Sequence, residues 1–262
     1  MPNHTHKKLP AWHKHIAQTL LNLGAKLRAR PVQTESPAQR FVDENANAWL
    51  FGVIFDQQVL AENAWEAPYL LKRRLGHFNM RRIAHMPIAD LRRAVAGGRN
   101  AKALHRYVKK VPVWLKEAAT KIATEYRGNA ANIWSDCHTA VEVIQRLDEF
   151  KGISQKKAHM AAAMIHVWQG LKRFDAINLA VDVHVRRVWR RAGLVKRGQT
   201  TELLAAAAEL YPRYPGALDY PTWEVGRTWC QASKPNCAGE EIGRPCPLAR
   251  WCQTANRFRR SL

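Results

Sequence analysis

The chain has 262 residues and a formal net charge of +21, because 42 lysines and arginines outnumber 21 aspartates and glutamates. This length suits one large domain or two modest ones, and a hydrophobic content of 47% allows a substantial core. The excess positive charge is spread along the whole chain, which favours a polyanionic partner, with nucleic acid as the leading candidate. An anionic membrane surface is less favoured, because no long basic amphipathic anchor is visible. A basic surface without a partner is the plain alternative.

The sequence pattern predicts neither a secretory signal nor a membrane span. Residues 1–9 are polar and rich in His and Lys, which predicts a disordered tail and lacks the apolar core of a signal peptide. The longest apolar run, residues 48–55, is too short to cross a bilayer. We therefore expect a cytoplasmic protein, associated with the nucleoid in a bacterium, that has no membrane partner.

Helical periodicity recurs along the chain, and no alternating strand pattern or hairpin signal interrupts it. The sequence therefore predicts an all-α fold. The predicted helices span, in chain order, residues 10–28, 44–55, 61–75, 88–95, a stretch from 111, a stretch capped by Ser135 or Asp136, 200–210 and 221–230.

A turn between two helical patterns carries the first candidate site. Gly152 can adopt a positive φ at low cost, Ile153 would pack inward, and a new helix would begin near Ser154. The free N–H groups at such a helix start bind phosphate oxygens, and Lys156 and Lys157 add positive charge there. Taken alone, the pattern is more typical of a plain corner between helices.

A second candidate is Asp182, which precedes another helical segment, VHVRRVW. It is placed as an N-cap, and capping alone is a sufficient role for an aspartate there. A capping carboxylate is also ionised and held in place, so it can serve in catalysis.

Four cysteines near the end of the chain have the spacing C-x6-C-x8-C-x5-C, at Cys230, Cys237, Cys246 and Cys252. Such clustering in a cytoplasmic protein predicts a metal site rather than disulfides. Zinc and an iron–sulfur cluster both accept four thiolates, and the spacing alone does not choose between them. Cys137 lies far from this group and is expected to be a buried thiol.

The segments GISQKKA and VDVHVRRV, followed by these cysteines, resemble the helix-hairpin-helix DNA glycosylase superfamily that includes endonuclease III. The resemblance implies a two-domain all-α fold that binds double-stranded DNA as a monomer. A six-helix barrel would occupy residues 44–160 and end in the hairpin. A helix and linker at 10–43 would pack with a domain at 161–262 that carries Asp182 and a [4Fe–4S] cluster on the four cysteines. The middle cysteine interval is six residues longer here than in the family pattern, and it would be tolerated if the extra loop bulges outward.

The resemblance also implies a reaction and the residues that perform it. Lys156 matches the nucleophile that forms a Schiff base with the sugar, and Asp182 matches the carboxylate that activates it. The expected activity is removal of a damaged or modified base, a pyrimidine first of all, followed by strand cleavage through β-elimination. A monofunctional glycosylase that uses water activated by Asp182 is one alternative, and a non-catalytic iron–sulfur DNA-binding protein is another.

The DNA contacts implied by the resemblance lie in three segments. Gln58 follows an apolar helix and would fill the gap left by the flipped base, although a polar helix end explains it equally well. The chain departs from the family pattern at Ser154, which replaces a glycine, and at Lys157, which replaces a threonine. The other predicted DNA-binding residues are Gly152, Ile153 and His184.

Overall fold

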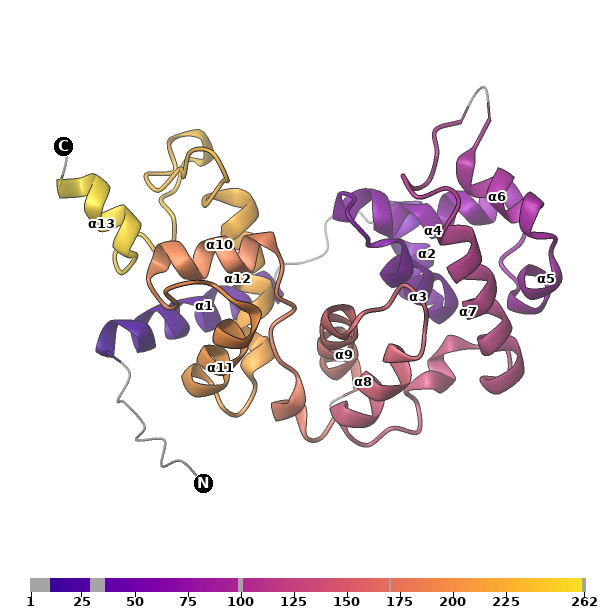
Figure 1. Cartoon of the computed structure of the whole chain (residues 1–262), viewed down its shortest axis with the longest axis horizontal. Coiled ribbons are helices and arrows are strands. Elements are labelled where there is room, and N and C mark those ends of the chain that lie inside the picture. The colour runs from indigo at the N-terminus through magenta and orange to yellow at the C-terminus, as the bar shows by residue number, and fades with distance from the viewer. Residues whose placement is uncertain (1–9, 29–35, 99–100, 170, 261–262) are drawn as a thin grey trace. The chain divides into compact units, whose positions relative to one another are not determined.

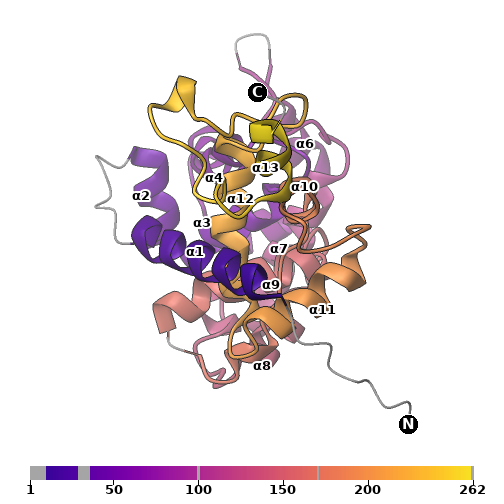
Figure 2. The ribbon, with the colours of Figure 1, turned by 90° about the vertical axis from the view of Figure 1, so that its left-hand side faces the viewer.

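The structure, a computed structural model, describes residues 10–28, 36–98, 101–169 and 171–260 (Figures 1 and 2). The tail predicted at residues 1–9 lies outside the described residues. The chain divides into two compact units: unit 1 contains Met1–Pro31 and Arg173–Leu262, and unit 2 contains Val32–Lys172. The described residues form helices and two isolated β-bridges, with no sheet, which confirms the predicted all-α fold.

Unit 2 is built around α3 (Ala46–Phe55), in which every side chain from Ala48 onward is buried. A helix that is apolar all round must be enclosed by other elements, and α3 packs against α2, α4 and α7. Gly52 allows α4 to come close, since a Cβ there would lie 2.6 Å from the Trp65 ring. The remaining helices of the unit are α2 (Pro37–Glu44), α4 (Ala61–Leu75), α5 (Met80–His85), α6 (Ile88–Ala96), α7 (Val111–Glu125), α8 (Ala140–Asp148) and α9 (Gln155–Gln169), with a 3-10 turn at Ala130–Ile133.

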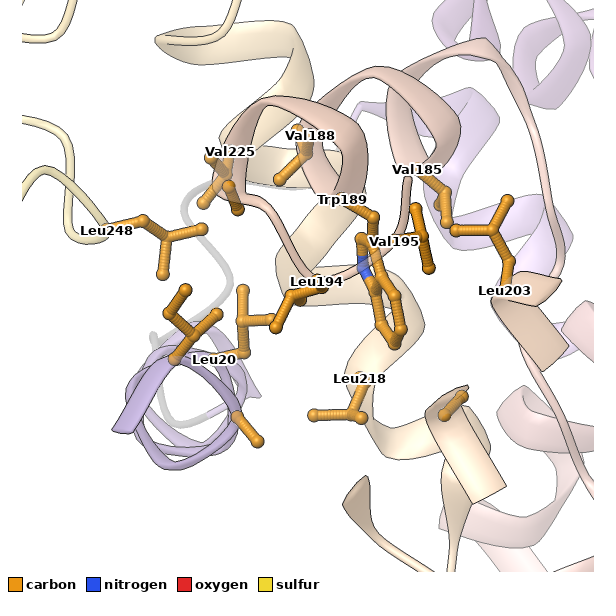
Figure 3. Packing of buried hydrophobic residues seen from close by; sticks show 14 of the residues in the cluster. Leu20, Val185, Val188, Trp189, Leu194, Val195, Leu203, Leu218, Val225 and Leu248 are labelled. Atoms are coloured by element: carbon orange, nitrogen blue, oxygen red, sulfur yellow. The ribbon is translucent and has the colours of Figure 1, made fainter. Parts of the chain in front are cut away.

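Unit 1 combines α1 (Ala11–Arg28) with the C-terminal part of the chain (Figure 3). Its core surrounds Trp189, which is fully buried and donates a 3.1 Å hydrogen bond from Nε1 to Thr222 Oγ1. Ile16 and Leu20 of α1 belong to the same core, so the N-terminal helix completes it. The other helices are α10 (Val183–Ala192), α11 (Thr200–Leu210), α12 (Asp219–Thr228) and α13 (Gln253–Arg260), with 3-10 turns at Phe174–Ala176, Pro215–Leu218 and Glu240–Ile242.

The predicted helices at 61–75 and 200–210 match α4 and α11, but two predicted boundaries were wrong. Neither Ser135 nor Asp136 caps the helix that follows them. Thr139 does so, in a reciprocal capping box with Glu142, because it is the residue that directly precedes the helix. The final predicted helix begins at Asp219, two residues before Pro221. In the described residues, no helix is both long enough and apolar enough to cross a membrane.

Candidate active site and cysteine cluster

The hairpin turn of unit 2 has the backbone that its sequence predicts. Gly152 has a φ of +88°, and a Cβ at this position would lie only 2.9 Å from the Trp114 ring and 3.3 Å from Ile54. Ile153 packs inward with 4% of its surface exposed, and its N–H donates to Phe150 O at 2.9 Å. Glycine is therefore required at position 152 both by the left-handed conformation and by the lack of space.

The start of α9 presents Lys156 to solvent. Ser154, Gln155 and Lys156 are all exposed, and the first N–H groups of any α-helix have no acceptor within the helix. This end of α9 therefore offers N–H donors and an amine together, as a phosphate contact requires. The roles predicted for Lys156 as nucleophile and for Gly152, Ile153 and Ser154 as DNA contacts remain predictions.

Lys157 differs from its predicted role, because its side chain is buried rather than exposed. Only 5% of the residue is exposed, and Nζ donates to three backbone carbonyls: Gly152 O at 2.8 Å, Val53 O at 3.0 Å and Ile54 O at 3.2 Å. The pKa of Lys157 is lowered to about 8, chiefly by burial; the charge of Asp56 opposes the shift and the charge of Lys156 adds to it. An amine held in this way does not reach a phosphate. It joins the hairpin turn to the end of α3.

The loop after α3 carries Gln58, which is exposed and has a φ of +54°. The hydroxyl of Tyr107 donates a short hydrogen bond to Gln58 Oε1. His105 supports the same loop: its Nδ1 accepts from Tyr107 N at 2.9 Å, so the proton lies on Nε2, which donates to Gln57 O at 3.1 Å. Burial lowers the pKa of His105, which is consistent with a neutral ring. Gln58 is thus held in an unusual backbone conformation at the surface, while its role as a wedge remains a prediction.

Asp182, in unit 1, is the N-cap of α10, as its sequence context predicts. Its Oδ1 accepts from Val185 N at 2.8 Å. Within the described part of the chain, Oδ2 accepts no hydrogen bond, and the side chain is only half buried. The cap therefore orients the carboxylate while leaving one oxygen open, which is what a general base or a charge-stabilising group needs.

His184, the second residue of the same helix, is engaged within unit 1. Its Nδ1 accepts a hydrogen bond from Arg187 at 2.9 Å, and its ring meets the Trp223 ring edge-on with a centroid distance of 6.3 Å. Gly226 makes room for it, since a Cβ there would lie 2.6 Å from His184 Cβ. These contacts position α10 against α12, and a DNA contact by His184 remains a prediction.

The four cysteines all line one pocket of unit 1, together with apolar side chains such as Val188 and Trp229. The pKa of Cys246 is raised to about 12, chiefly by burial, with a smaller contribution from the other three thiols. Arg191 borders the pocket, with its NH1 3.5 Å from Cys230 Sγ and its carbonyl 3.3 Å from Cys252 Sγ. The group therefore gathers four sulfur donors in one place. Among the described residues, however, no three His, Cys, Asp or Glu are placed to hold a metal ion.

The long interval between the second and third cysteines forms an outward loop. Cys246 N donates to Cys237 O at 3.0 Å and closes the base of the loop. Its tip is the 3-10 turn at Glu240–Ile242, bounded by Gly239 and Gly243 with φ values of +75° and +72°. Glu240, Glu241 and residues 243–245 are exposed. The extra residues thus add surface without separating the neighbouring thiols from the pocket.

Sequence reasoning predicted neither the burial of Lys157 nor the supporting role of His105 in unit 2. Lys157 could have been recognised from helical spacing, because positions 157, 158, 161, 162 and 165 lie on one face and the last four are apolar. No comparable signal marks His105, whose partners are a backbone carbonyl 48 residues away and a neighbouring N–H.

Comparison with known proteins places the chain in a family. It is 29% identical over 140 residues to an endonuclease III from Synechocystis sp., a match covering 47% of this chain and 58% of that protein's length. Its fold is similar to that of a thermostable thymine-DNA glycosylase, with a TM-score of 0.61 and 14% identity over 94% of this chain and 97% of the other. The sequence model of the HhH-GPD superfamily base excision DNA repair proteins matches residues 51–213, well over half of the chain, and the protein belongs to this superfamily of helix-hairpin-helix DNA glycosylases.

Proposed function

We propose that this protein removes a damaged or modified pyrimidine from double-stranded DNA and then cleaves the strand as a lyase. The observation that carries the proposal is the exposed amine of Lys156 at the start of α9, directly after the glycine turn. A helix start that binds phosphate and carries a lysine brings a nucleophile to the sugar–phosphate backbone. The similarity to an endonuclease III, and to a fold described for a thymine-DNA glycosylase, supports a pyrimidine substrate.

In the proposed reaction, neutral Lys156 attacks the sugar C1′ while the bond from C1′ to the base breaks. The base leaves with the bonding electrons and takes up a proton. Asp182 stabilises the cationic sugar and accepts a proton from the amine, a role for which its open Oδ2 is suited. The sugar then opens to an imine on Lys156, and loss of a 2′ proton expels the 3′ phosphate. Each step uses groups of the chain, the substrate and water.

Access to the base requires the nucleotide to leave the stack. We assign Gln58 to the gap that remains in the duplex. Its exposure, its positive φ and the hydrogen bond from Tyr107 support the assignment, because they present the side chain outward on a loop that is otherwise held in place. The enzyme would act as a monomer on cytoplasmic or nucleoid DNA.

The cysteine group is proposed to hold a [4Fe–4S] cluster. Four thiols line one pocket and would supply the four-thiolate donor set that a [4Fe–4S] cluster accepts. When bound, the cluster would supply iron–thiolate bonds that fix the loops around Cys230, Cys237, Cys246 and Cys252. Iron and acid-labile sulfide measured on anaerobically purified protein test this, and stoichiometric zinc without sulfide would overturn it.

Borohydride trapping tests the lyase directly. Wild-type protein and the control Lys26→Ala, a change at an exposed lysine of unit 1, should both form a covalent adduct with a duplex that contains a substrate base. Lys156→Ala should form none. An equal adduct in Lys156→Ala would refute the nucleophile. Base release without an adduct in any variant would favour the monofunctional alternative, in which Asp182 activates water. Release that persists in Asp182→Asn would refute the role of Asp182.

A further inference from the structure

One face of α10 carries a row of cations that the proposed reaction does not use. Val183, Arg186, Arg187, Arg190 and Arg191 recur at spacings of three and four residues, so they share that face. Together with Lys196 and Thr254, they line an open hollow of about 550 Å³ in unit 1. We call its five cations, Arg186, Arg187, Arg190, Arg191 and Lys196, the α10 stripe.

Three of the four arginines of the stripe, Arg186, Arg187 and Arg191, are held by neutral groups. Arg187 donates to Cys230 O at 2.6 Å and to Gly226 O at 2.9 Å. Arg191 donates to the carbonyls of Gln231 and Ala232 at 2.5 and 2.8 Å. Carbonyls orient a guanidinium without cancelling its charge, so these cations are fixed in place and still positive.

No ion pair recorded for the described residues involves any member of the α10 stripe. The carboxylate of Glu202, in the adjacent α11, accepts instead from the backbone N–H groups of Lys196, Arg197 and Gly198. Five cations around one hollow without a paired carboxylate repel one another, and an anion in the hollow would relieve that repulsion.

Gly198 brings two of the cations together. A Cβ at this position would lie 2.6 Å from Arg190 Cδ and 3.2 Å from Arg186 Cγ, so the stems of both arginines lie against the bare glycine. Arg186 also donates to Gly198 O and, at 3.2 Å, to Thr200 Oγ1. The local backbone thus holds the positively charged side chains of Arg186 and Arg190 close together.

We propose that the α10 stripe binds phosphates of the DNA backbone, at a site separate from the hairpin. The cations of α10 run from Arg186 to Arg191, a rise of about 7.5 Å at 1.5 Å per residue, which corresponds to about two nucleotide steps of about 3.4 Å. The stripe can therefore contact more than one phosphate of a strand. A free small anion would occupy only part of a hollow of about 550 Å³, which favours a polyanion. This inference rests on the proposed function only in taking duplex DNA as the partner.

The dependence of DNA affinity on salt tests the proposal. Arg190 is exposed, and its side chain donates no recorded hydrogen bond to any of the described residues, so Arg190→Gln should leave the fold intact. The probe is an undamaged duplex, titrated with the full-length protein between 50 and 200 mM salt. Each lost phosphate contact should lower the slope of log affinity against log salt by about 0.9. The ratio of the wild-type affinity to the Arg190→Gln affinity should therefore fall by about 3.5-fold between 50 and 200 mM salt. The double variant Arg190→Gln with Lys196→Gln should show a larger fall in this ratio.

Arg213→Gln is the matched control, because Arg213 is an exposed arginine of the same unit outside the stripe. Its slope should match wild type. An unchanged slope in the double variant, or an equal fall in Arg213→Gln, would overturn the proposal. Trapping on a substrate duplex is measured in parallel. If the stripe variants keep the salt slope of wild type while the wild-type protein is trapped on DNA, only the proposal for the stripe is refuted. If the stripe variants show a smaller slope but the wild-type protein is not trapped, only the lyase proposal is refuted.

Discussion

The buried amine of Lys157 should make the stability of unit 2 depend on pH in alkaline solution. In the folded chain its pKa is lowered from 10.5 to about 8. Between these two values the unfolded chain binds more protons than the folded chain, so the free energy of unfolding should rise as the pH rises. Below pH 8 the amine is charged in both states and the full cost of burying that charge is present.

The size of the effect follows from the same two values. The pKa of Lys157 differs between the unfolded chain (10.5) and the folded chain (about 8). At 1.36 kcal/mol for each pKa unit, this difference changes the free energy of unfolding by about 3 kcal/mol. Urea unfolding, followed by tryptophan fluorescence, would be measured at several pH values from 7.5 to 10.5. The difference in stability between wild type and Lys157→Met should change by up to about 3 kcal/mol across this range, in favour of wild type at high pH.

A control variant and a second measurement keep this prediction open to refutation. Lys109→Met removes an exposed lysine of the same unit, and its stability should run parallel to that of wild type over the whole pH range. The Nζ resonance of Lys157, assigned by its loss in Lys157→Met, should titrate near pH 8 in nuclear magnetic resonance spectra. Titration above pH 10, or parallel curves for wild type and Lys157→Met, would show that the amine is solvated.

Three further substitutions test the local structure. Gly152→Ala should destabilise unit 2 by about 1–3 kcal/mol in urea, because of its φ of +88° and the contact with Trp114, and an unchanged midpoint would contradict the turn. Asp182→Ala should cost about 1 kcal/mol of stability through loss of the cap, whereas Asp182→Asn should keep it; equal losses would argue against the cap bond to Val185. Trp189→Ala should cost about 3–5 kcal/mol, and a loss under 1 kcal/mol would mean that Trp189 is not central to the core.

The long helices could be predicted from the sequence, because apolar residues recur at helical spacing over several turns. The short helices α2 and α5 have eight and six residues, too few for the period to stand out. The start of α8 was misplaced for a different reason. Ser135, Asp136 and Thr139 are all good capping residues, and the reciprocal bond with Glu142, three residues on, favours Thr139.

The candidate site was only partly predictable, because charge and burial are separate properties. Two adjacent lysines look alike in sequence, yet the rotation of about 100° between neighbouring residues of a helix sends Lys156 to solvent and Lys157 into the interior. Residue types and spacing predicted the glycine turn and the cap at Asp182, since both are local. The three carbonyls that receive the Lys157 amine include two that are more than 100 residues away in sequence, so only the fold brings them together.

The net charge of the chain predicted a polyanionic partner, but it did not identify the cations that bind this partner. The helix α10 shows that some of its cations have a structural explanation and others do not. Asp182 at its first end and Arg190 and Arg191 in its last turn are favourable with the helix dipole, so those three charges have a structural explanation. Arg186 and Arg187 lie in the middle of the helix, where the dipole offers little. Carbonyls hold them in place without neutralising them, so neither the dipole nor an ion pair accounts for their charge. A phosphate in the hollow would account for it, so the charges in the middle of the helix argue for a DNA contact independently of the helix dipole.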